Sequence, residues 1–283
     1  MSVNAAGVDV VSLEDILFND VQMFLKNEAV LLSTITDYTS KIQRNAKSFD
    51  VPKLSGLAVT DRLDSGVEHT SGGMGFDVDV VALDQHKIAP EFIYDLAREK
   101  TALNLDDAFL EVAPPALGDV IEQAVYSELK LASASAPDHI QQLTGAANLV
   151  PTIEDISKAA RILNQAKVPM TNRYLIVDAV GYEALMNIAD IRDASKSGST
   201  SALVKGQFAE ISGFKLLWSN NADAGEMLCW HSTAMAFGMK KAVTFEKERQ
   251  ASKERDYVSL KTSYGKKILD SGKRVVLFNA TGL

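Results

Sequence analysis

The part of the chain that decides the fold begins with VPMTNRYLIVDAVGYEALMNI, residues 168–188. Its Val-Pro pair ends a preceding amphipathic helix, and an apolar strand over 173–178 and a helix over 180–188 follow. A polar loop rich in Gly, Ser and Lys leads to ISGFKLLWSNN, residues 211–221, and then to a run of Ala, Met and Phe. The alternating strand DYVSLKTSYG, residues 256–265, completes an order of elements that few soluble proteins share.

Length and composition predict a folded protein with an acidic surface. The 283 residues are 46% hydrophobic, which is enough to bury a large core in one domain or in two packed domains. The formal net charge of −8 disfavours sequence-independent binding of nucleic acid unless a local basic patch overrides it. The sequence shows no such patch, because the densest group of Lys and Arg, over 240–255, is interleaved with glutamates.

The single cysteine indicates that no disulfide forms within the chain. Cys229 lies in an apolar run between Leu228 and Trp230, which predicts a buried, inert thiol and fits a reducing compartment. The N-terminus lacks the basic and apolar regions of a secretory signal, and no window reaches the roughly 20 apolar residues of a membrane helix. The sequence therefore predicts a soluble protein that is cytosolic when made and has no membrane contact.

The N-terminal part predicts a helical arm and a projecting loop. Residues 13–42 are compatible with a helix whose apolar stripe needs a partner surface. The members of this stripe are Ile16, Leu17, Val21, Phe24 and Leu25. Two strand-like segments, 48–51 and 76–83, flank a Gly-rich stretch that is too long for an ordinary hairpin turn. In the second strand Phe76 and alternate residues after it are apolar and are separated by aspartates, the pattern of a half-exposed strand.

Periodicity and end signals predict further elements, and these are helices over 90–98, 103–112, 115–131 and 152–166 and a final strand over 274–278. Pro115 suits the first turn of the third helix. Thr152, with Asp155 three residues on, is typical of a capping box at the start of the fourth. No repeat and no linker separates independently folding halves, so the predicted class is α+β.

The sequence offers no group of residues that predicts catalysis, a cofactor or a metal. The four histidines lie far apart without metal-binding spacing, at His69, His86, His139 and His231. Segments 71–75 and 195–201 lack the signatures of a phosphate loop and of a nucleophile elbow, so we interpret both as solvated loops. Two pairs of carboxylates could in principle support acid/base catalysis, namely Asp77 with Asp79 and Asp106 with Asp107. Such pairs are common on the surface of any acidic protein. We therefore predict no catalytic, cofactor-binding or metal-binding residues and no cofactor.

The C-terminal two-thirds of the chain resembles the major capsid proteins of tailed bacteriophages, which share the HK97 fold. The resemblance rests on the order of the elements. A strand at 76–83 returns from an extended loop, and a helix at 115–131 is similar to the spine helix of the family. The capped helix at 152–166, the Arg-Tyr strand at 173–178, a Gly-Phe segment at 213–220 and the Tyr-Gly strand at 256–265 follow in that order. Pro114 and Pro115 depart from the pattern, because they predict an interrupted or shortened spine helix. The first 50 residues match only loosely.

The resemblance implies five parts, which are an N-terminal arm (1–47), an extended loop or β-hairpin (48–82), a peripheral domain with the spine helix (83–145), an axial domain (146–239) and a return to the peripheral domain (240–283). It implies a structural protein, not an enzyme, whose copies form hexamers and pentamers of an icosahedral head around double-stranded DNA. Such a subunit resides in the virion and is assembled in the host cytoplasm. Its implied partners are itself, a portal, in some shells a decoration protein, and DNA that is enclosed without sequence-specific binding.

Two other classes remain open, an encapsulin-type cellular shell with the same fold and a soluble α+β enzyme. Particle size under native conditions would separate a shell protein from an enzyme. Protein cargo would distinguish an encapsulin, and the sequence gives no sign of it.

Three expectations concern assembly. The sequence starts directly with the candidate arm, which predicts a separately encoded scaffolding protein. Some members of the family join a loop lysine to an asparagine of a neighbour, but no lysine lies between Leu54 and Gln85, which predicts noncovalent shells. Loss of the 54–75 loop, or of the apolar Phe24 and Leu25, is expected to prevent assembly without unfolding the subunit.

Overall fold

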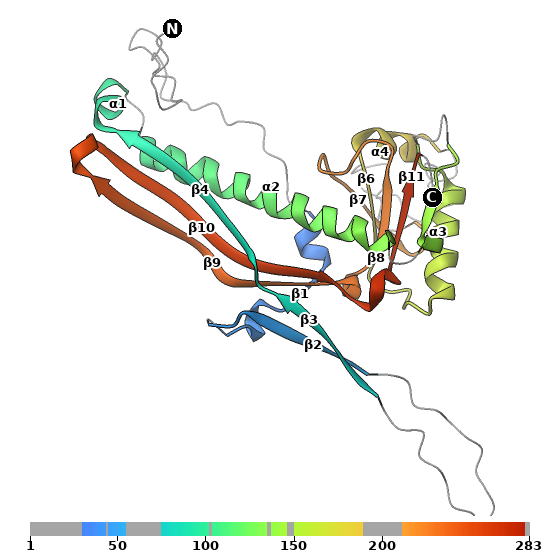
Figure 1. Ribbon diagram of the computed structural model, residues 1–283. Coiled ribbons are helices and arrows are strands. Elements are labelled where there is room, and N and C mark those ends of the chain that lie inside the picture. Colours follow the sequence, from blue (N-terminus) through green and yellow to red (C-terminus); the bar gives the residue numbers. More distant parts are fainter. Residues whose placement is uncertain are drawn as a thin grey trace, which may run out of the picture.

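The described residues form an elongated molecule built from three sheets and a long helix (Figure 1). The computed structural model describes residues 30–43, 45–54, 75–101, 104–134, 137–145, 150–188 and 211–280. A long sheet lies along the long helix, a compact sheet lies at one end, and a hairpin projects from the long sheet (Figure 1). Most of the predicted arm, the tip of the predicted loop, His69 and the 195–201 segment lie outside the described residues.

The long sheet is dominated by two antiparallel strands, β9 (Met235–Gln250) and β10 (Arg255–Ile268), joined through a 3-10 turn at Ala251–Lys253. The short strand β1 (Thr36–Asp37) pairs with β9, and β4 (Gln85–Tyr94) pairs with β10, so the order is β1-β9-β10-β4. The structure confirms the strand predicted over 256–265, which lies within β10. The mixed-charge segment that the sequence marked only as solvated forms most of β9.

Strand β4 replaces part of a predicted helix. Residues 90–94 belong to β4, which pairs with β10 along its whole length, and the helix α1 (Asp95–Lys100) begins only afterwards. Pro90 cannot donate a backbone hydrogen bond, but β4 lies at the edge of the described sheet, where a proline is tolerated. The helix predicted over 90–98 is therefore wrong in its first half, because strand pairing outweighs a weak helical pattern.

The helix α2 (Leu105–Ala134) replaces the two helices predicted on either side of Pro114. It runs through Pro114 and Pro115, which lack N–H groups and were expected to interrupt it. Ala113 and Leu117, which flank the prolines, are both buried. The prediction of a shortened helix is wrong, because packing of one face of a long helix outweighs the loss of two backbone hydrogen bonds.

The long helix and the long sheet share one core with part of the compact sheet. Its larger buried members are Leu31, Leu117, Ile121, Val125, Leu129, Ile176, Trp230, Phe237, Leu260, Tyr264 and Val275. Trp230 stacks on Tyr174 with ring centroids 5.8 Å apart. Because strands of both sheets contribute to this core, the sheets are held together by apolar contact as well as by the chain.

The compact sheet has the order β5-β11-β8-β6-β7. Its strands are β5 (Ile140–Gln142), β11 (Val275–Asn279), β8 (Met227–His231), β6 (Arg173–Val177) and β7 (Phe214–Trp218). The helix α3 (Ile153–Gln165) packs its buried Ile156 and Leu163 into a second core cluster, which it shares with strands of the compact sheet. The helix α4 (Ala179–Met186) follows β6 after one residue. The predicted helices and strands of this region are confirmed.

The start of α3 is fixed by the predicted capping box. Asp155 N donates to Thr152 Oγ1 at 3.3 Å, and Thr152 N donates to the Asp155 carboxylate at 3.0 Å. The buried Asp155 also accepts a hydrogen bond from the Thr144 hydroxyl at 3.0 Å. This carboxylate therefore joins the segment after β5 to the first turn of α3.

Residues 30–42 are not the end of the helix predicted over 13–42. They form 3-10 turns at Leu31–Thr34 and Thr39–Lys41 on either side of β1, which runs parallel to β9. Thr34 Oγ1 donates to Leu31 O at 2.7 Å, and Thr36 Oγ1 donates to Ser232 O at 3.0 Å. Such side-chain bonds to the backbone compete with helix formation, which explains this error.

An ion network joins the end of the β9–β10 hairpin that lies away from the compact sheet to α1 and to the start of α2. These elements lie at the same end of the molecule (Figure 1). Asp256 lies 2.8 Å from Arg98, 3.2 Å from Arg249 and 3.3 Å from Lys247. Arg98 and Lys247 each lie 3.0 Å from Asp106 as well. Burial acts to raise the pKa of Asp256, but hydrogen bonds from the three cations outweigh it and hold that pKa below its usual value.

Asp256→Asn is expected to lower the free energy of unfolding at neutral pH by about 1 kcal/mol. Because the pKa of Asp256 is depressed in the folded state, its contribution is complete above the unfolded-state pKa of about 3.9 and is lost as pH falls through the folded-state pKa. Urea unfolding of both proteins should therefore show a stability difference that shrinks below about pH 4. A difference that stays constant on acidification would contradict this assignment.

Candidate assembly surface

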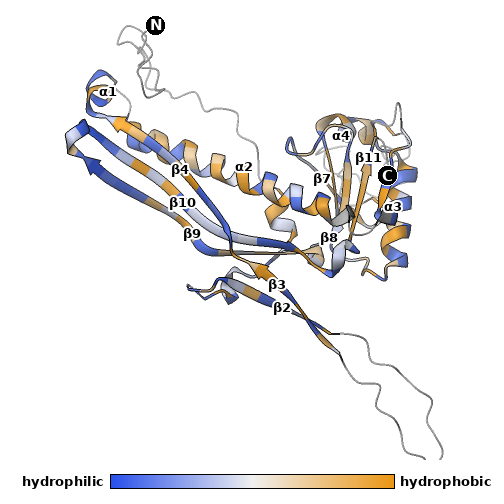
Figure 2. Cartoon of the chain, in the orientation of Figure 1, coloured by the Kyte–Doolittle hydropathy of each residue, from blue (hydrophilic) through white to orange (hydrophobic). Residues whose placement is uncertain are grey.

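The projecting hairpin exposes an apolar face. Its strands β2 (Ser48–Leu54) and β3 (Phe76–Ala82) are antiparallel, with Leu54 opposite Phe76. Apolar and polar residues alternate along it (Figure 2). The exposed fractions on one face are 61% for Leu54, 72% for Phe76, 47% for Val78 and 49% for Val80. We call these four residues the hairpin apolar face.

The opposite face of the hairpin packs on the long sheet. Val81 is fully buried in a small cluster with Ala236 and Leu269, and Phe49 and Tyr38 pack against it. The Tyr38 and Phe49 ring centroids lie 5.6 Å apart. The sequence predicts the alternation in β3 correctly, but the apolar residues that it marks are the outward ones. The contact with the long sheet is made by Val81 and Phe49, on the opposite face of the hairpin.

Polar contacts also hold the hairpin to the end of β10 and to the turn that follows it. Lys53 forms an ion pair with Asp270, and Lys267 Nζ donates to Val80 O at 2.9 Å and lies 3.6 Å from Asp79. Burial acts to raise the pKa of Asp270, but Lys53 and Arg274 outweigh it and lower that pKa. These contacts tie both strands of the hairpin to the C-terminal part of the chain.

Two facing glycines make room for the hairpin. Gly265 of β10 lies opposite Gly238 of β9. A Cβ on Gly265 would lie 2.3 Å from Ala82 O, which is backbone of the hairpin, and a Cβ on Gly238 would lie 2.4 Å from the Ile42 side chain. The hairpin can cross the long sheet this closely because neither strand carries a side chain there.

A buried carboxylate fixes the start of the described chain. Glu122 of α2 is 1% exposed and accepts hydrogen bonds from Val30 N at 3.1 Å and from Ser219 Oγ at 3.4 Å. Burial raises the pKa of Glu122, partly offset by hydrogen bonds that include those from the backbone of Val30 and Leu31. Val30, the first described residue, is therefore tied to the middle of the long helix.

The residues weighed as chemical candidates are engaged in separate structural contacts. His86 Nδ1 lies 2.9 Å from Ser263 Oγ, His139 Nδ1 lies 2.7 Å from Val275 O, and His231 Nδ1 lies 2.8 Å from Thr233 Oγ1. No group of three or more His, Cys, Asp or Glu that could hold a metal ion occurs among the residues with described positions.

The carboxylate pairs and the cysteine also have structural surroundings. Asp77 and Asp79 lie on the hairpin, whereas Asp106 belongs to the ion network and Asp107 accepts a hydrogen bond from the Asn104 side chain at 2.6 Å. Cys229 is fully buried, and burial raises the pKa of its thiol, as predicted for an inert cysteine. None of the helices that the structure describes is both long and apolar enough to cross a membrane.

Comparison with known proteins identifies the family. Residues 101–280 match the family model described as phage capsid protein. This match covers more than half of the chain, so the chain belongs to the phage capsid protein family. A curated relative, the major capsid protein of Escherichia phage T5, is 27% identical over 133 residues, which are 45% of this chain and 29% of that protein.

Solved structures show the same fold over almost the whole chain. A chain of Mycobacterium phage Che8 superimposes with a TM-score of 0.76 at 20% identity and covers 95% of this chain and 97% of its own length. The capsid structure of cyanophage P-SCSP1u gives a TM-score of 0.76 at 17% identity, with coverages of 94% and 93%. The predicted α+β capsid fold is confirmed, as is the prediction of a structural phage protein located in the virion. The comparisons give no support to an encapsulin or an enzyme.

Proposed function

We propose that the chain is a major capsid subunit whose copies form hexamers and pentamers and close an icosahedral head around double-stranded DNA. The observation that carries the proposal is the hairpin apolar face, which a single subunit leaves exposed. A contiguous exposed apolar patch marks an interaction site, and in a symmetric shell one such contact recurs in every copy. The occupant of this face is therefore a neighbouring copy of the chain.

The proposal includes a division of the subunit into five parts, namely an arm (1–47), an extended loop (48–82), a peripheral domain (83–145), an axial domain (146–239) and a return segment (240–283). Sheet membership supports one change to it. The strands β5 and β11 belong to the same sheet as β6 and β8, so we assign them to the axial part. The long sheet and α2 then form the peripheral part.

Further partners belong to the proposal. A head that is filled with DNA through one vertex needs a portal, and a shell of fixed size needs a separate scaffolding protein and, in some heads, a decoration protein. DNA would be enclosed without sequence-specific binding, in keeping with the net charge of −8. Assembly would take place in the host cytoplasm.

The proposed function is tested by the size of the assembled protein. The full chain, expressed with the scaffolding protein encoded beside its gene, should elute as megadalton particles and appear as closed shells by negative-stain electron microscopy. Expression of the chain alone should give capsomers or irregular particles. A monodisperse monomer or small oligomer under both conditions would contradict the proposal.

Shells of this protein are expected to be held together without covalent links. The lysine nearest to the hairpin tip, Lys53, lies at the described end of β2 and is paired with Asp270. A denaturing gel of mature particles should therefore show a single band, that of the monomer. A ladder of multimers would contradict this prediction and would direct attention to the lysine that forms the link.

A further inference from the structure

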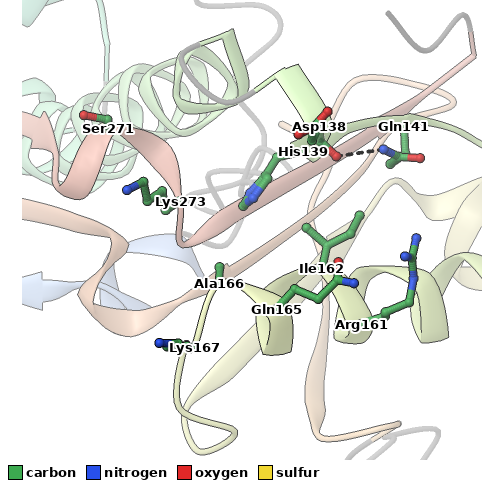
Figure 3. A pocket seen from close by; sticks show the side chains of 10 residues that line it. All are labelled: Asp138, His139, Gln141, Arg161, Ile162, Gln165, Ala166, Lys167, Ser271 and Lys273. Atoms are coloured by element: carbon green, nitrogen blue, oxygen red, sulfur yellow. Dashed lines mark hydrogen bonds between the residues drawn. The ribbon is translucent and has the colours of Figure 1, made fainter.

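A pocket of about 740 Å³ gathers basic side chains from separate parts of the chain. It lies where the C-terminal end of α3 approaches the 3-10 turn Pro137–His139 and the turn Asp270–Gly272 before β11 (Figure 3). Arg161, Lys167 and Lys273 line it and are all exposed. The only acidic side chain among the lining residues is Asp138.

The charge of this pocket is not neutralised within the described part of the subunit. Ten basic residues outside the pocket form ion pairs with described residues. Arg161, Lys167 and Lys273 form none with a described residue. The C-terminal end of α3 is equivalent to about half a negative charge, and Asp138 adds one. Three cations therefore leave the pocket with a net charge of about +1.5 in a chain whose net charge is −8.

The helix end explains part of this arrangement but not all of it. Arg161 and Lys167 lie near the end of α3, where cations are commonly placed. Lys273 comes from a segment more than 100 positions away, where it follows the 3-10 turn Asp270–Gly272, so the end of α3 does not account for it. In Figure 3 Lys167 and Lys273 lie at one end of the pocket and Arg161 at the other, with His139 between them.

This spacing favours a ligand with several separated negative charges over a single ion. Uncharged donors suited to phosphate oxygens, the Gln165 amide and the Ser271 hydroxyl, line the same pocket. We propose that the pocket binds the phosphate backbone of double-stranded DNA and forms a local contact between the head wall and the enclosed genome. This inference rests on the proposed function, because that function supplies DNA as the polyanion that the subunit meets.

The test compares two triple variants of the full-length chain. In one, Arg161, Lys167 and Lys273 are replaced with Gln. In the matched control, three exposed lysines elsewhere, Lys100, Lys215 and Lys253, are replaced with Gln, so that the net charge changes equally. Fluorescence anisotropy measures binding of a labelled duplex of about 20 base pairs from about 50 to 200 mM salt.

The pocket variant should bind the duplex about 100-fold more weakly than the unmodified chain at the lowest salt. The slope of log affinity against log salt should fall by about 2.7, corresponding to three lost phosphate contacts. The control should keep most of the affinity, and inorganic phosphate should compete no better than chloride at equal ionic strength.

Four results would overturn the inference, namely no measurable binding by the unmodified chain, unchanged binding by the pocket variant, an equal loss in both variants, or displacement by inorganic phosphate alone. Electron microscopy of the same variants, assembled with the scaffolding protein, separates this question from the proposed function. Normal shells with unchanged DNA binding would remove only the inference. Absence of shells from the unmodified chain would remove the proposed function.

Discussion

Replacing Phe76 and Val78 with aspartate is expected to abolish shell assembly while leaving the subunit folded. Both side chains belong to the hairpin apolar face, at 72% and 47% exposure, so the single subunit loses little buried apolar area. In the shell each copy would have to bury two unpaired carboxylates, and each such charge costs several kcal/mol. Because the contact recurs in every copy, the penalty multiplies over the lattice.

Electron microscopy and circular dichroism together measure this outcome. The double variant should show a near-native spectrum and capsomers or free subunits in place of shells. Asp77→Asn is the matched control, because it changes the neighbouring residue on the opposite face of the same strand and should assemble normally. Normal shells from the double variant would show that this face is not a contact between subunits.

Gly265→Val is expected to destabilise the subunit by about 3 kcal/mol and to prevent assembly. The new side chain would meet Ala82 O, a backbone atom that cannot move without shifting β3, as well as the buried Leu83 side chain. The hairpin would therefore have to separate from the long sheet or change its angle. Either change misplaces the hairpin apolar face in every copy.

Gly118→Ala provides the control for a substitution at glycine. A Cβ at Gly118 meets no atom within 4 Å, and the residue lies in the interior of α2. Alanine there should stabilise the subunit by about 0.5–1 kcal/mol and leave shells unchanged. Urea unfolding of the two variants should thus move in opposite directions. A Gly265→Val protein as stable as the unmodified chain would contradict the close crossing of the hairpin.

The sequence predicts the compact half of the subunit well because its elements are governed by local signals. The capping box at Thr152, the break at Pro169 and the apolar run that begins at Arg173 are each readable within a few residues. The long half is harder to predict, because its elements depend on distant partners. The path of α2 through Pro114 and Pro115 requires a core supplied by strands more than 100 residues away.

The assembly surface could be anticipated only in part. Alternation from Phe76 onward predicts a strand with one apolar side, but sequence alone does not say which side faces the body. The side is set by the contacts of Val81 and Phe49 with the long sheet. The buried Glu122 gives no sequence signal, since one acidic residue in an amphipathic helix is ordinary. The basic pocket was also missed, because Lys273 is remote in sequence from the two α3 cations.

The way in which the chain passes between the long sheet and the compact sheet has a mechanical consequence. The strand β8 continues into β9 through Ser232–Ala234, and β10 continues into β11 through the turn at Asp270–Gly272, so two neighbouring crossings join the sheets. The hydrogen bonds between β9 and β10 are perpendicular to the strands. Tension that pulls β9 and β10 in opposite directions along their length strains these bonds in shear, all together, whereas a force that peels the hairpin from its tip breaks them one at a time. The pair should thus resist such opposed tension far better than peeling.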